Sequence, residues 1–409
     1  MERTILHCDC NSFYASVETL LDPTLAEGPA AVCGDPESRH GIILAKNEKA
    51  KAFGVQTAET IWQAKRKCPD LRLVAPHRAE YVKYSRRCNE LYLQYTDLVD
   101  PFGIDESFLD VTGSKHLFGT GEQIADELRR RMREEIGLTI SVGVSFNRAF
   151  AKLGSDYKKP DATTVFSRGN FRERVWPLPA NTLLYVGKRA AARLDGLGVH
   201  TIGDLAACDP AFLHRVFGKL GDTLLRYARG EDDEPVRSFY AEREVKSVGN
   251  GMTFAHNLLG EEECRMGLTA LCDNVGRRLR ARGLVCQTVQ LTIRDPEFHN
   301  RSRQVTLTQP TNSTRALFET TLALLRAHWP MNKPVRLLTV TAANLLPENQ
   351  SCEQLSLFDS AADVQSRQKQ RDLDRAVDAL RQKFGNQSVI FANSVRKPKE
   401  TEKKGEKET

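Results

Sequence analysis

Short apolar segments of strand length alternate with longer amphipathic segments over the first third of the chain, and this order restricts the possible folds. A predicted strand at 4–8 runs into a helix at 12–21, and paired short strands at 103–112 precede a further helix and a strand at 138–145. Strands in this order suit a mostly antiparallel sheet backed by helices. We therefore expect an α+β catalytic core.

Two further folded parts are predicted after this core. Between 181 and 230, short helical segments are separated by glycines, which indicates a small helical domain. An acidic stretch at 231–235 has the composition of a linker. Alternating strands at 288–294 and 304–308, with helical segments between strands, then predict a second, smaller α+β unit. The chain of 409 residues is long enough for such a multidomain arrangement.

The basic charge of the chain is concentrated in the second α+β unit. The net charge is +6, and residues 236–347 hold 15 Lys and Arg against 9 Asp and Glu, a difference that equals the whole excess. A locally basic domain is typical of proteins that bind phosphate backbones, although a solvated surface can have the same composition.

Targeting and metal-binding cysteine signals are not found in the sequence. No run of eighteen or more apolar residues occurs, and the first ten residues do not resemble a targeting segment, so we expect a cytoplasmic protein without a membrane partner. None of the ten cysteines forms a pair at the two-residue spacing of zinc ribbons and redox motifs. We expect reduced thiols, most of them packed in the interior.

Three acidic residues stand next to predicted strands. Asp9 follows the first strand, and Asp105 and Glu106 lie in the paired strands. Carboxylates from neighbouring strand ends can hold two Mg²⁺ about 4 Å apart and stabilise both oxygens of a phosphoryl transfer. Because magnesium prefers oxygen, Cys10 is expected to add its backbone carbonyl and not its sulfur. Taken alone, an Asp-Glu pair is more often a solvated turn.

In order and in flanking sequence, the acids and their neighbours resemble the Y-family, lesion-bypass DNA polymerases, especially the DNA polymerase IV branch. The resemblance covers about 4–358 and rests on five motifs in the same order. These are Asp9, Phe13-Tyr14 leading into Ala15-Ser16-Val17-Glu18, Gly103 to Asp110, Ser141 to Ser145, and Ala151-Lys152-Leu153 through Pro160.

The resemblance implies a right-hand polymerase that copies DNA past lesions by two-metal nucleotidyl transfer from dNTPs to a primer 3′-OH. It implies that Asp9, Asp105 and Glu106 bind the two Mg²⁺ ions. The implied domains are a palm at 1–11 and 76–166, fingers at 12–75, a helical thumb at 167–235, a little finger at 236–347 and a tail at 348–409. These domains leave no room for a proofreading exonuclease, so we expect low fidelity and distributive synthesis.

Nucleotide contacts are also implied, with one departure from the family pattern. Tyr14 corresponds to a steric gate against the ribose 2′-hydroxyl, although an ordinary core aromatic is the alternative. Phe13, Lys51 and Lys159 correspond to nucleotide contacts. Glu48 and Lys51 stand where the family has Tyr and Arg, and lysine lacks the two-pronged geometry of arginine while a glutamate repels phosphate. Replacing Lys51 with Ala is expected to raise the KM for dNTPs.

Primer-template DNA is the expected macromolecular substrate. In the thumb, loops with Gly187, Lys188 and Gly198 correspond to a DNA-binding element, since glycine lets backbone N–H groups approach a phosphate, with helix capping as the alternative. In the little finger, the arginines are expected to follow the duplex backbone. They are Arg277, Arg278, Arg280, Arg282, Arg294, Arg301 and Arg303.

The tail holds a short peptide and a helix. Gln354, Leu355, Leu357 and Phe358 lie in a pentapeptide, QLSLF, that resembles the segment by which bacterial polymerases dock into the sliding clamp, the β subunit. The following amphipathic helix, with Leu373, Val377, Leu380 and Phe384 on one face, is expected to pack on its own protein. We expect a monomer.

Three other functions remain open on the sequence alone. One is a catalytic subunit like that of DNA polymerase V. Another is a catalytically silent, clamp-tethered DNA-binding scaffold, which would not need three acids. The third is a palm-type nucleotidyl cyclase, which would need neither the thumb glycines nor a basic appended domain.

Overall fold

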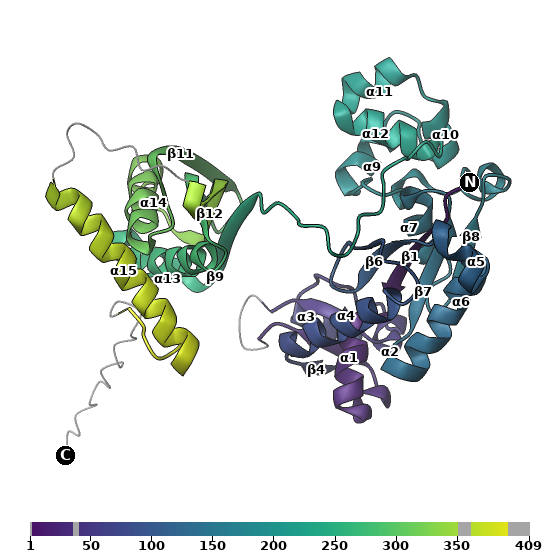
Figure 1. Ribbon diagram of the computed structural model, residues 1–409, viewed down its shortest axis with the longest axis horizontal. Coiled ribbons are helices and arrows are strands. Elements are labelled where there is room, and N and C mark those ends of the chain that lie inside the picture. The colour runs from purple at the N-terminus through teal and green to yellow at the C-terminus, as the bar shows by residue number, and fades with distance from the viewer. Residues whose placement is uncertain (1, 36–40, 351–360, 392–409) are drawn as a thin grey trace, which may run out of the picture. The chain divides into compact units, whose positions relative to one another are not determined.

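The computed structural model describes residues 2–35, 41–350 and 361–391, except for the side chains at 361–364 and 367. Two compact units are present, the first through Glu242 and the second from Arg243 onward (Figure 1). The pentapeptide Gln354 to Phe358 lies outside the described residues.

A five-stranded sheet forms the centre of the first unit, in the order β5-β6-β1-β7-β8. Its strands are β1 (Ile5–Cys10), β5 (Val99–Pro101), β6 (Glu106–Asp110), β7 (Ile140–Ser145) and β8 (Thr163–Phe166). Only the β7–β8 pair is parallel, so the expected antiparallel character is confirmed. The first strand ends two residues later than predicted, because Asp9 still pairs with both neighbouring strands, opposite Glu106 and Ser141.

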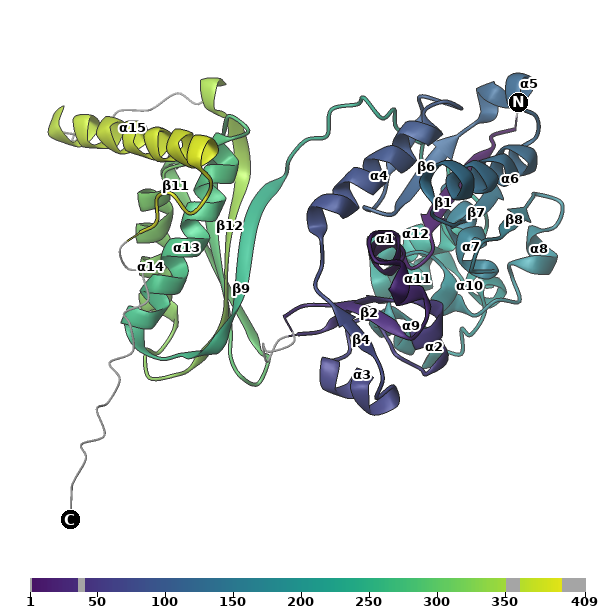
Figure 2. The ribbon, with the colours of Figure 1, turned by 90° about the horizontal axis from the view of Figure 1, so that it is seen from below.

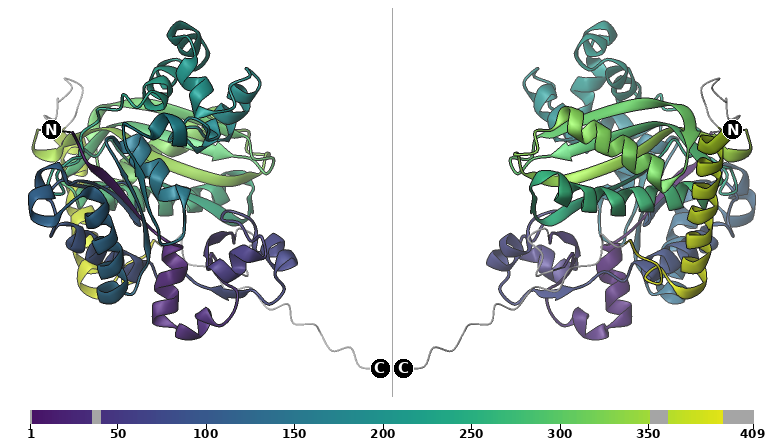
Figure 3. Two further views of the ribbon diagram at one scale, coloured as in Figure 1. Left: turned by 90° about the vertical axis from the view of Figure 1, so that its right-hand side faces the viewer. Right: turned by 90° about the vertical axis from the view of Figure 1, so that its left-hand side faces the viewer.

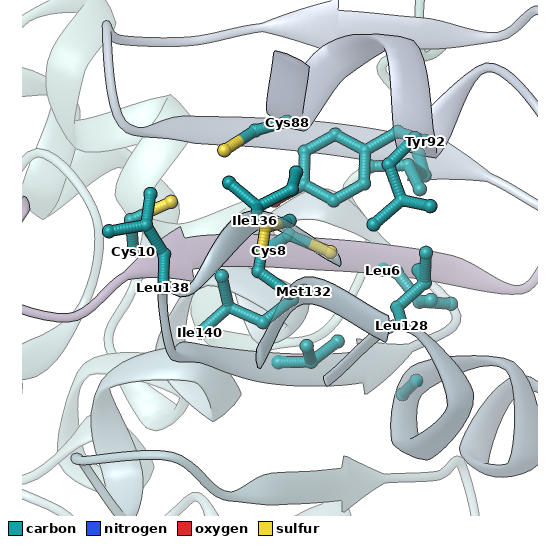
Figure 4. Packing of buried hydrophobic residues seen from close by; sticks show 14 of the residues in the cluster. Leu6, Cys8, Cys10, Cys88, Tyr92, Leu128, Met132, Ile136, Leu138 and Ile140 are labelled. Carbon is teal, nitrogen blue, oxygen red and sulfur yellow. The ribbon is translucent and has the colours of Figure 1, made fainter. Parts of the chain in front are cut away.

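Helices cover both faces of this sheet. The sheet is contacted by α4 (Arg78–Tyr92), α6 (Gly121–Arg131) and α7 (Arg148–Tyr157). The same part of the chain also forms α1 (Phe13–Leu21), α5 (Lys115–Phe118), 3₁₀ turns at Pro23–Ala26 and Thr112–Ser114 and a π-turn at Met132–Ile136. On one face, Leu6, Cys8 and Cys10 of β1 pack with residues of α4 and α6 in a continuous apolar core (Figure 4). On the other face, α7 lies against β7 and β1.

Gly143 of β7 allows α7 to approach the sheet closely. A Cβ at this position would lie 1.9 Å from the carbonyl oxygen of Ala151 and 2.5 Å from the backbone nitrogen of Ser155. Since both obstacles are backbone atoms of α7, any larger residue must push the helix away. This contact fixes the distance between α7, which carries Lys152, and β1, which carries Asp9.

Gly143→Ala is therefore expected to lower the free energy of unfolding by about 1–3 kcal/mol, the usual range for overpacking, and to reduce activity by displacing α7. Gly113→Ala is the matched control, because a Cβ there meets no atom within 4 Å. Urea denaturation of both variants measures the difference. Equal denaturation midpoints for the two variants would show that α7 can move away from the sheet without lowering the free energy of unfolding.

Two smaller subdomains complete the first unit. A three-stranded sheet in the order β3-β2-β4 carries two short helices, and a group of short helices follows the central sheet, as expected between 181 and 230. The elements of the first are β2 (Ala30–Cys33), β3 (Ile43–Lys46), α2 (Glu48–Ala52), α3 (Ile61–Lys67) and β4 (Arg72–Val74). Those of the second are α8 (Phe171–Arg174), a 3₁₀ turn at Ala180–Thr182, α9 (Lys188–Asp195), α10 (Ile202–Ala207), α11 (Pro210–Phe217) and α12 (Lys219–Ala228).

The acidic stretch at 231–235 is not a free linker, which corrects the sequence-based interpretation. The carboxylate of Asp232 is buried and accepts the backbone N–H groups of Arg148 and Ala149 at the start of α7. Arg148 also donates to the Pro235 carbonyl at 3.0 Å, and Val236 is buried. An acidic side chain at a helix N-terminus satisfies otherwise unpaired N–H groups, so this stretch is anchored to the first unit.

The second unit has a four-stranded antiparallel sheet in the order β11-β10-β12-β9. Its elements are β9 (Ser247–Leu258), α13 (Gly260–Arg280), β10 (Leu284–Arg294), β11 (Asn300–Thr311), α14 (Thr314–His328), β12 (Val335–Pro347), a 3₁₀ turn at Glu348–Gln350 and α15 (Ala361–Phe384). Helices α13 and α14 cover one face of the sheet (Figures 2 and 3). Val289, Leu291 and Ile293 point into the core beneath them, as predicted.

Helix α15 packs on its own unit, as expected, but through its charged face. Arg381 donates two hydrogen bonds to Asp273 of α13 (2.9 and 2.8 Å), and Asp378 accepts two from Arg280 of α13 (2.6 and 3.1 Å). The apolar stripe is instead exposed at Leu373, Leu380 and Phe384. The prediction of the packing face was wrong, because buried Arg-Asp pairs replace the usual apolar contact.

Two expectations from composition can be compared with the fold. The nine cysteines in the described part of the chain are free thiols, and all but Cys208 are buried. Within the same residues, none of the helices has both the length and the apolar composition that a membrane span requires.

Candidate active site

The strand register brings the predicted acids together at one end of the central sheet. Asp9 of β1 stands opposite Glu106 of β6, and the carbonyl of Asp105 accepts the backbone N–H of Cys10 at 2.9 Å. Asp9 and Asp105 line a cavity of about 340 Å³, together with Tyr14 and Lys159. Two stretches that lie almost a hundred residues apart in the sequence therefore supply one acidic wall.

Two lysines lie against these acids. The Lys152 ammonium donates to Asp9 Oδ2 (2.9 Å) and Glu106 Oε2 (2.8 Å). Lys159 lies 2.8 Å from Asp9 Oδ1 and 2.7 Å from Asp156 Oδ1. Both ammonium groups thus occupy positions where positive charge is strongly favoured. Burial opposes the charge of Lys152, but Asp9 and Asp156 outweigh it and raise the pKa of Lys152.

Asp105 and Glu106 are adjacent in sequence but differ in acidity. Burial, and then the charges of Asp9 and Glu106, raise the pKa of Asp105 to about 6. Burial also disfavours ionisation of Glu106, yet the neighbouring His7 and Lys152 outweigh it and lower its pKa to about 2. The carboxylates thus lie close enough together that Asp105 keeps its proton up to a higher pH than an isolated aspartate does. A cation at this wall would relieve the crowding.

His7 of β1 adds an unpaired nitrogen to the acidic wall. The Ser155 hydroxyl donates to the Lys152 carbonyl (2.8 Å), so it accepts the Nδ1–H of His7 at 2.8 Å. Nε2 of His7 is buried, has no hydrogen-bond partner among the described residues and lies 3.3 Å from Glu106 Oε2. Two electron-pair donors that face each other at this distance favour a proton or a cation between them.

The residues present fit divalent cations. Donor atoms of His7, Asp9 and Glu106 lie within 4.8 Å of one another, and three carboxylates are the oxygen donors that Mg²⁺ prefers. The acids that line the cavity, Asp9, Asp105 and Glu48, match its lysines in number. A polyanionic substrate therefore needs additional positive charge to bind there.

The sulfur of Cys10 lies in the apolar core (Figure 4). Its thiol contacts that of Cys88 of α4, and this hydrogen bond together with burial raises the pKa of Cys10 well above its usual value. Figure 4 shows the sulfurs of Cys8, Cys10 and Cys88 within the apolar core. Cys10 also lines the cavity.

Tyr14 of α1 lines the cavity on a rigid support. Its ring stacks on Tyr81 of α4, with centroids 4.3 Å apart and an interplanar angle of 14°. The Tyr81 hydroxyl donates to the buried Glu18 carboxylate, which also pairs with His77 at 2.9 Å. A ring held in this way resists displacement by a substrate group. Phe13, beside it, is buried and also reaches the cavity.

The residues expected to contact DNA differ in their exposure and in their hydrogen-bond partners. Gly187 is the N-cap of α9, which begins at Lys188, and Gly198 has a positive φ of 76° with open space around its Cα. In the second unit, Arg277 donates to Asn386 and Arg278 to the Gly249 carbonyl, while Arg303 lies on the exposed edge strand β11. Gly187, Lys188, Gly198 and Arg303 thus remain accessible to a phosphate backbone.

The prediction that Arg280 binds DNA is corrected by the structure. Its side chain is 8% exposed and pairs with Asp374 and Asp378 of α15, and it also donates to the Asn312 carbonyl. A guanidinium with these partners is not free to bind DNA. Arg280 therefore holds α15 in place.

The uncovered face of the sheet in the second unit was not predicted as a functional surface. Thr292 pairs in register with Ser302 of β11 and Thr339 of β12, and Thr339 pairs with Gly251 of β9. These residues alternate with the buried Leu291 and Ile293, so they face away from α13 and α14. The hydroxyls of Thr292, Ser302 and Thr339 make this face polar.

Sequence reasoning also missed His7, Lys152, Ser155, Tyr81 and Glu18. Lys152 lies within a matched motif, but nothing in the sequence places its ammonium against Asp9. The supporting pair Tyr81 and Glu18 is 63 residues apart, and only the fold brings the two together.

Relatives match nearly the whole chain, and family models match two segments of it. Residues 8–156 match the impB/mucB/samB family, and residues 245–357 match the impB/mucB/samB family C-terminal domain. The chain is 46% identical over 389 residues to a DNA polymerase IV of Acetivibrio thermocellus, which covers 95% of this chain and 96% of that protein. It is 36% identical over 405 residues to DNA polymerase IV 1 of Bacillus subtilis, with 98% and 95% covered.

The fold is also found among solved structures. A Y-family DNA polymerase chimera superimposes with a TM-score of 0.75 at 22% identity, covering 84% of this chain and 99% of the chimera. At this identity the likeness shows the fold, a right-hand α+β polymerase with palm, fingers, thumb and little finger.

Proposed function

Because the chain belongs to the impB/mucB/samB family of Y-family DNA polymerases, we propose that it joins dNTPs to a primer 3′-OH. The reaction takes place in the cavity beside Asp9, Asp105 and Glu106 and uses two Mg²⁺ ions. The chain is a DNA-directed DNA polymerase of the translesion class, as its relatives indicate, and divalent metals are general in this family. The observation that carries the proposal is the convergence of Asp9 and Glu106 in register beside Asp105.

The residues at the cavity have different roles in the proposed reaction. Asp9, Asp105, Glu106 and the Cys10 carbonyl hold the metal ions, which when bound neutralise charge on the attacking and leaving oxygens. Lys152 bridges the carboxylates of Asp9 and Glu106, because its ammonium donates a hydrogen bond to each of them. The rigid geometry means that little rearrangement is needed when substrate binds.

The nucleotide occupies the space between the acids and the finger segment. Tyr14 lies where its ring can exclude a 2′-hydroxyl, Phe13 adds a packing surface, and Lys51 and Lys159 contribute positive charge for the triphosphate. Ribonucleotides are rejected because the Tyr14 ring, stacked on Tyr81, cannot move aside.

The DNA substrate lies along basic and polar surfaces of both units. We assign the palm to 1–11 and 76–166, the fingers to 12–75, the thumb to 167–235 and the little finger to 236–347, followed by the tail. Gly187, Lys188 and Gly198 of the thumb offer backbone and ammonium donors to phosphates. Arg277, Arg278 and Arg303 contribute in the little finger, together with the polar sheet face at Thr292. No base is read, so binding is independent of sequence and weakens with salt.

Primer extension tests this function. The purified chain with a primer, a defined template, dNTPs and Mg²⁺ should add the complementary nucleotide and should pass a template lesion, and chelation of the metal should stop it. A chain that bound DNA without extending the primer would instead be the silent scaffold, and one that cyclised a nucleotide without a template would be the cyclase.

The pentapeptide at 354–358 is proposed to bind the sliding clamp, so replacing Leu357 and Phe358 with Ala should abolish stimulation by the clamp. Two apolar anchors of this size typically supply most of the affinity of a pocket-binding peptide. Extension without clamp should stay within about twofold of wild type, since the change lies far in sequence from the acids. Extension assays with and without clamp measure both effects.

A matched control replaces Leu380 and Phe384 of α15, which are exposed apolar residues outside the pentapeptide. The control should keep its stimulation by the clamp. Loss of stimulation in the control but not in the peptide variant would move the clamp contact to α15. Sedimentation of the free chain should give a monomer.

A further inference from the structure

The finger segment departs from the family pattern at the residues expected to bind the triphosphate. Strand β3 ends at Lys46, and Asn47 caps α2 by accepting the Ala50 N–H at 2.9 Å while it also accepts the Ala30 N–H at 3.1 Å. With this turn fixed, Lys46, Glu48 and Lys51 line the same cavity as Asp9. The cavity thus has one acidic and two basic finger residues.

The charge of Lys51 is offset by its neighbour. Its ammonium lies 3.2 Å from Glu48 Oε2, and the other Glu48 oxygen accepts a hydrogen bond from Ser12. Half-exposed pairs of this kind contribute little stability, so the pair does not lock Lys51. A polyanion that approaches Lys51 nevertheless meets the Glu48 carboxylate next to that ammonium, and the repulsion offsets much of the attraction.

The charge of Lys46 is not offset in this way. Its Nζ donates to the Thr57 hydroxyl at 3.2 Å, and among the described residues no carboxylate lies within ion-pair distance of it. Thr57 also lines the cavity. Because Thr57 accepts this hydrogen bond, its own proton remains available for a phosphate oxygen.

The third lysine of the cavity, Lys159, is already paired with acids, which offset part of the charge that it contributes to the triphosphate. Lys159 contacts Asp9 and Asp156 at 2.8 and 2.7 Å, at the acidic wall. Of the three lysines that line the described cavity, Lys46 is therefore the one without a carboxylate within ion-pair distance, and Glu48 and Glu59 act on its charge only from farther away. Burial, and then the charge of Lys51, lower the pKa of Lys46, which is the setting in which a bound anion is most favourable.

We propose that Lys46, held by Thr57, is the finger cation that binds the triphosphate of the incoming dNTP, and that Glu48 cancels most of the contribution of Lys51. This inference rests on the proposed polymerase function and replaces the Tyr and Arg of the family pattern with a Lys-Thr pair. It makes Glu48 a residue that weakens nucleotide binding.

Steady-state extension and nucleotide binding test this inference. Lys46→Met, which keeps the apolar stem and removes the charge, should raise the KM for dNTPs on the order of tenfold or more, as expected for a lost charge-assisted hydrogen bond, with kcat changed by less than about threefold. Lys51→Met should raise KM by a smaller factor. Glu48→Gln should lower KM, because it removes the repulsion and frees Lys51. Thr57→Val should shift KM in the same direction as Lys46→Met.

The matched control is Lys49→Met. Lys49 lies on the same helix, but its ammonium donates to the Glu27 carbonyl at 2.8 Å and it is not among the residues that line the cavity. Its KM should equal that of wild type. Calorimetric binding of a non-hydrolysable dNTP analogue to the chain with primer-template and Mg²⁺ should follow the same order of variants, and Lys46→Arg should bind more tightly than Lys46→Met.

The outcomes separate this inference from the function on which it rests. A wild-type chain that extends a primer, with Lys46→Met at wild-type KM or with Lys51→Met more impaired than Lys46→Met, would overturn the assignment of Lys46 and leave the polymerase intact. A wild-type chain that neither binds the analogue nor extends a primer would overturn both.

Discussion

Asp105→Asn is expected to lower kcat for dNTP incorporation by about 1,000-fold or more, because loss of a metal-binding carboxylate removes several kcal/mol of stabilisation from the transition state. Asp105 lies beside Asp9 and Glu106, and burial together with the charges of these two residues raises its pKa. The amide is close in shape to the acid, so the fold should persist. Single-turnover extension at saturating dNTP measures the effect, and a DNA-binding assay should show unchanged affinity.

Asp110→Asn is the matched control for this prediction. Asp110 ends the same strand, β6, but its carboxylate accepts hydrogen bonds from Thr112 and stands away from the cavity. It should retain activity within about threefold, as expected for an exposed or half-buried change without a catalytic role. Equal losses in the two variants would mean that β6 is merely sensitive to substitution.

Tyr14→Ala is expected to reduce discrimination against ribonucleotides by about 10- to 100-fold, which corresponds to relief of about 1–3 kcal/mol of steric overlap. The ring lines the cavity and is stacked on Tyr81, so its removal opens space next to the incoming sugar. The ratio of kcat/KM for a dNTP and for the matching rNTP measures the effect, and most of the change should appear in the rNTP value.

Two further variants show whether the position of Tyr14 matters. Tyr81→Leu should weaken discrimination in part, because the Tyr14 ring loses its stacked partner. Tyr240→Ala should leave discrimination unchanged, since Tyr240 is an exposed tyrosine outside the cavity. If Tyr14→Ala rejected ribonucleotides as strongly as wild type, Tyr14 would be a packing residue and another group would form the gate.

The parts of the fold that follow from local pattern could be predicted from the sequence. The central antiparallel sheet and the second α+β unit have a clear hydrophobic period, glycines separate the short segments of the small helical part, and the structure confirms all three. Asp9, Asp105 and Glu106 could be singled out because strand ends and a family motif coincide there. The error in the first strand was small, since a two-residue extension at Cys10 does not change its period.

What depends on contacts between distant residues could not be predicted. Arg280 was assigned to DNA because it is one of many arginines, whereas Asp374 and Asp378 bury its charge. The apolar face of α15 was expected to be covered, because amphipathic helices normally bury that face. Asp232 was taken as part of a linker, yet it caps α7 from more than eighty residues away in the sequence. No local period encodes these partners.

The position of metal ions in a ternary complex tests the central claim most directly. A crystal of the chain with primer-template, a non-hydrolysable dNTP and Mn²⁺ can be measured at an X-ray energy at which manganese scatters anomalously. We predict two anomalous peaks at the wall formed by Asp9, Asp105 and Glu106, both in contact with carboxylate oxygens and with the triphosphate. A ternary complex with nucleotide bound but without manganese at these three residues would contradict the account.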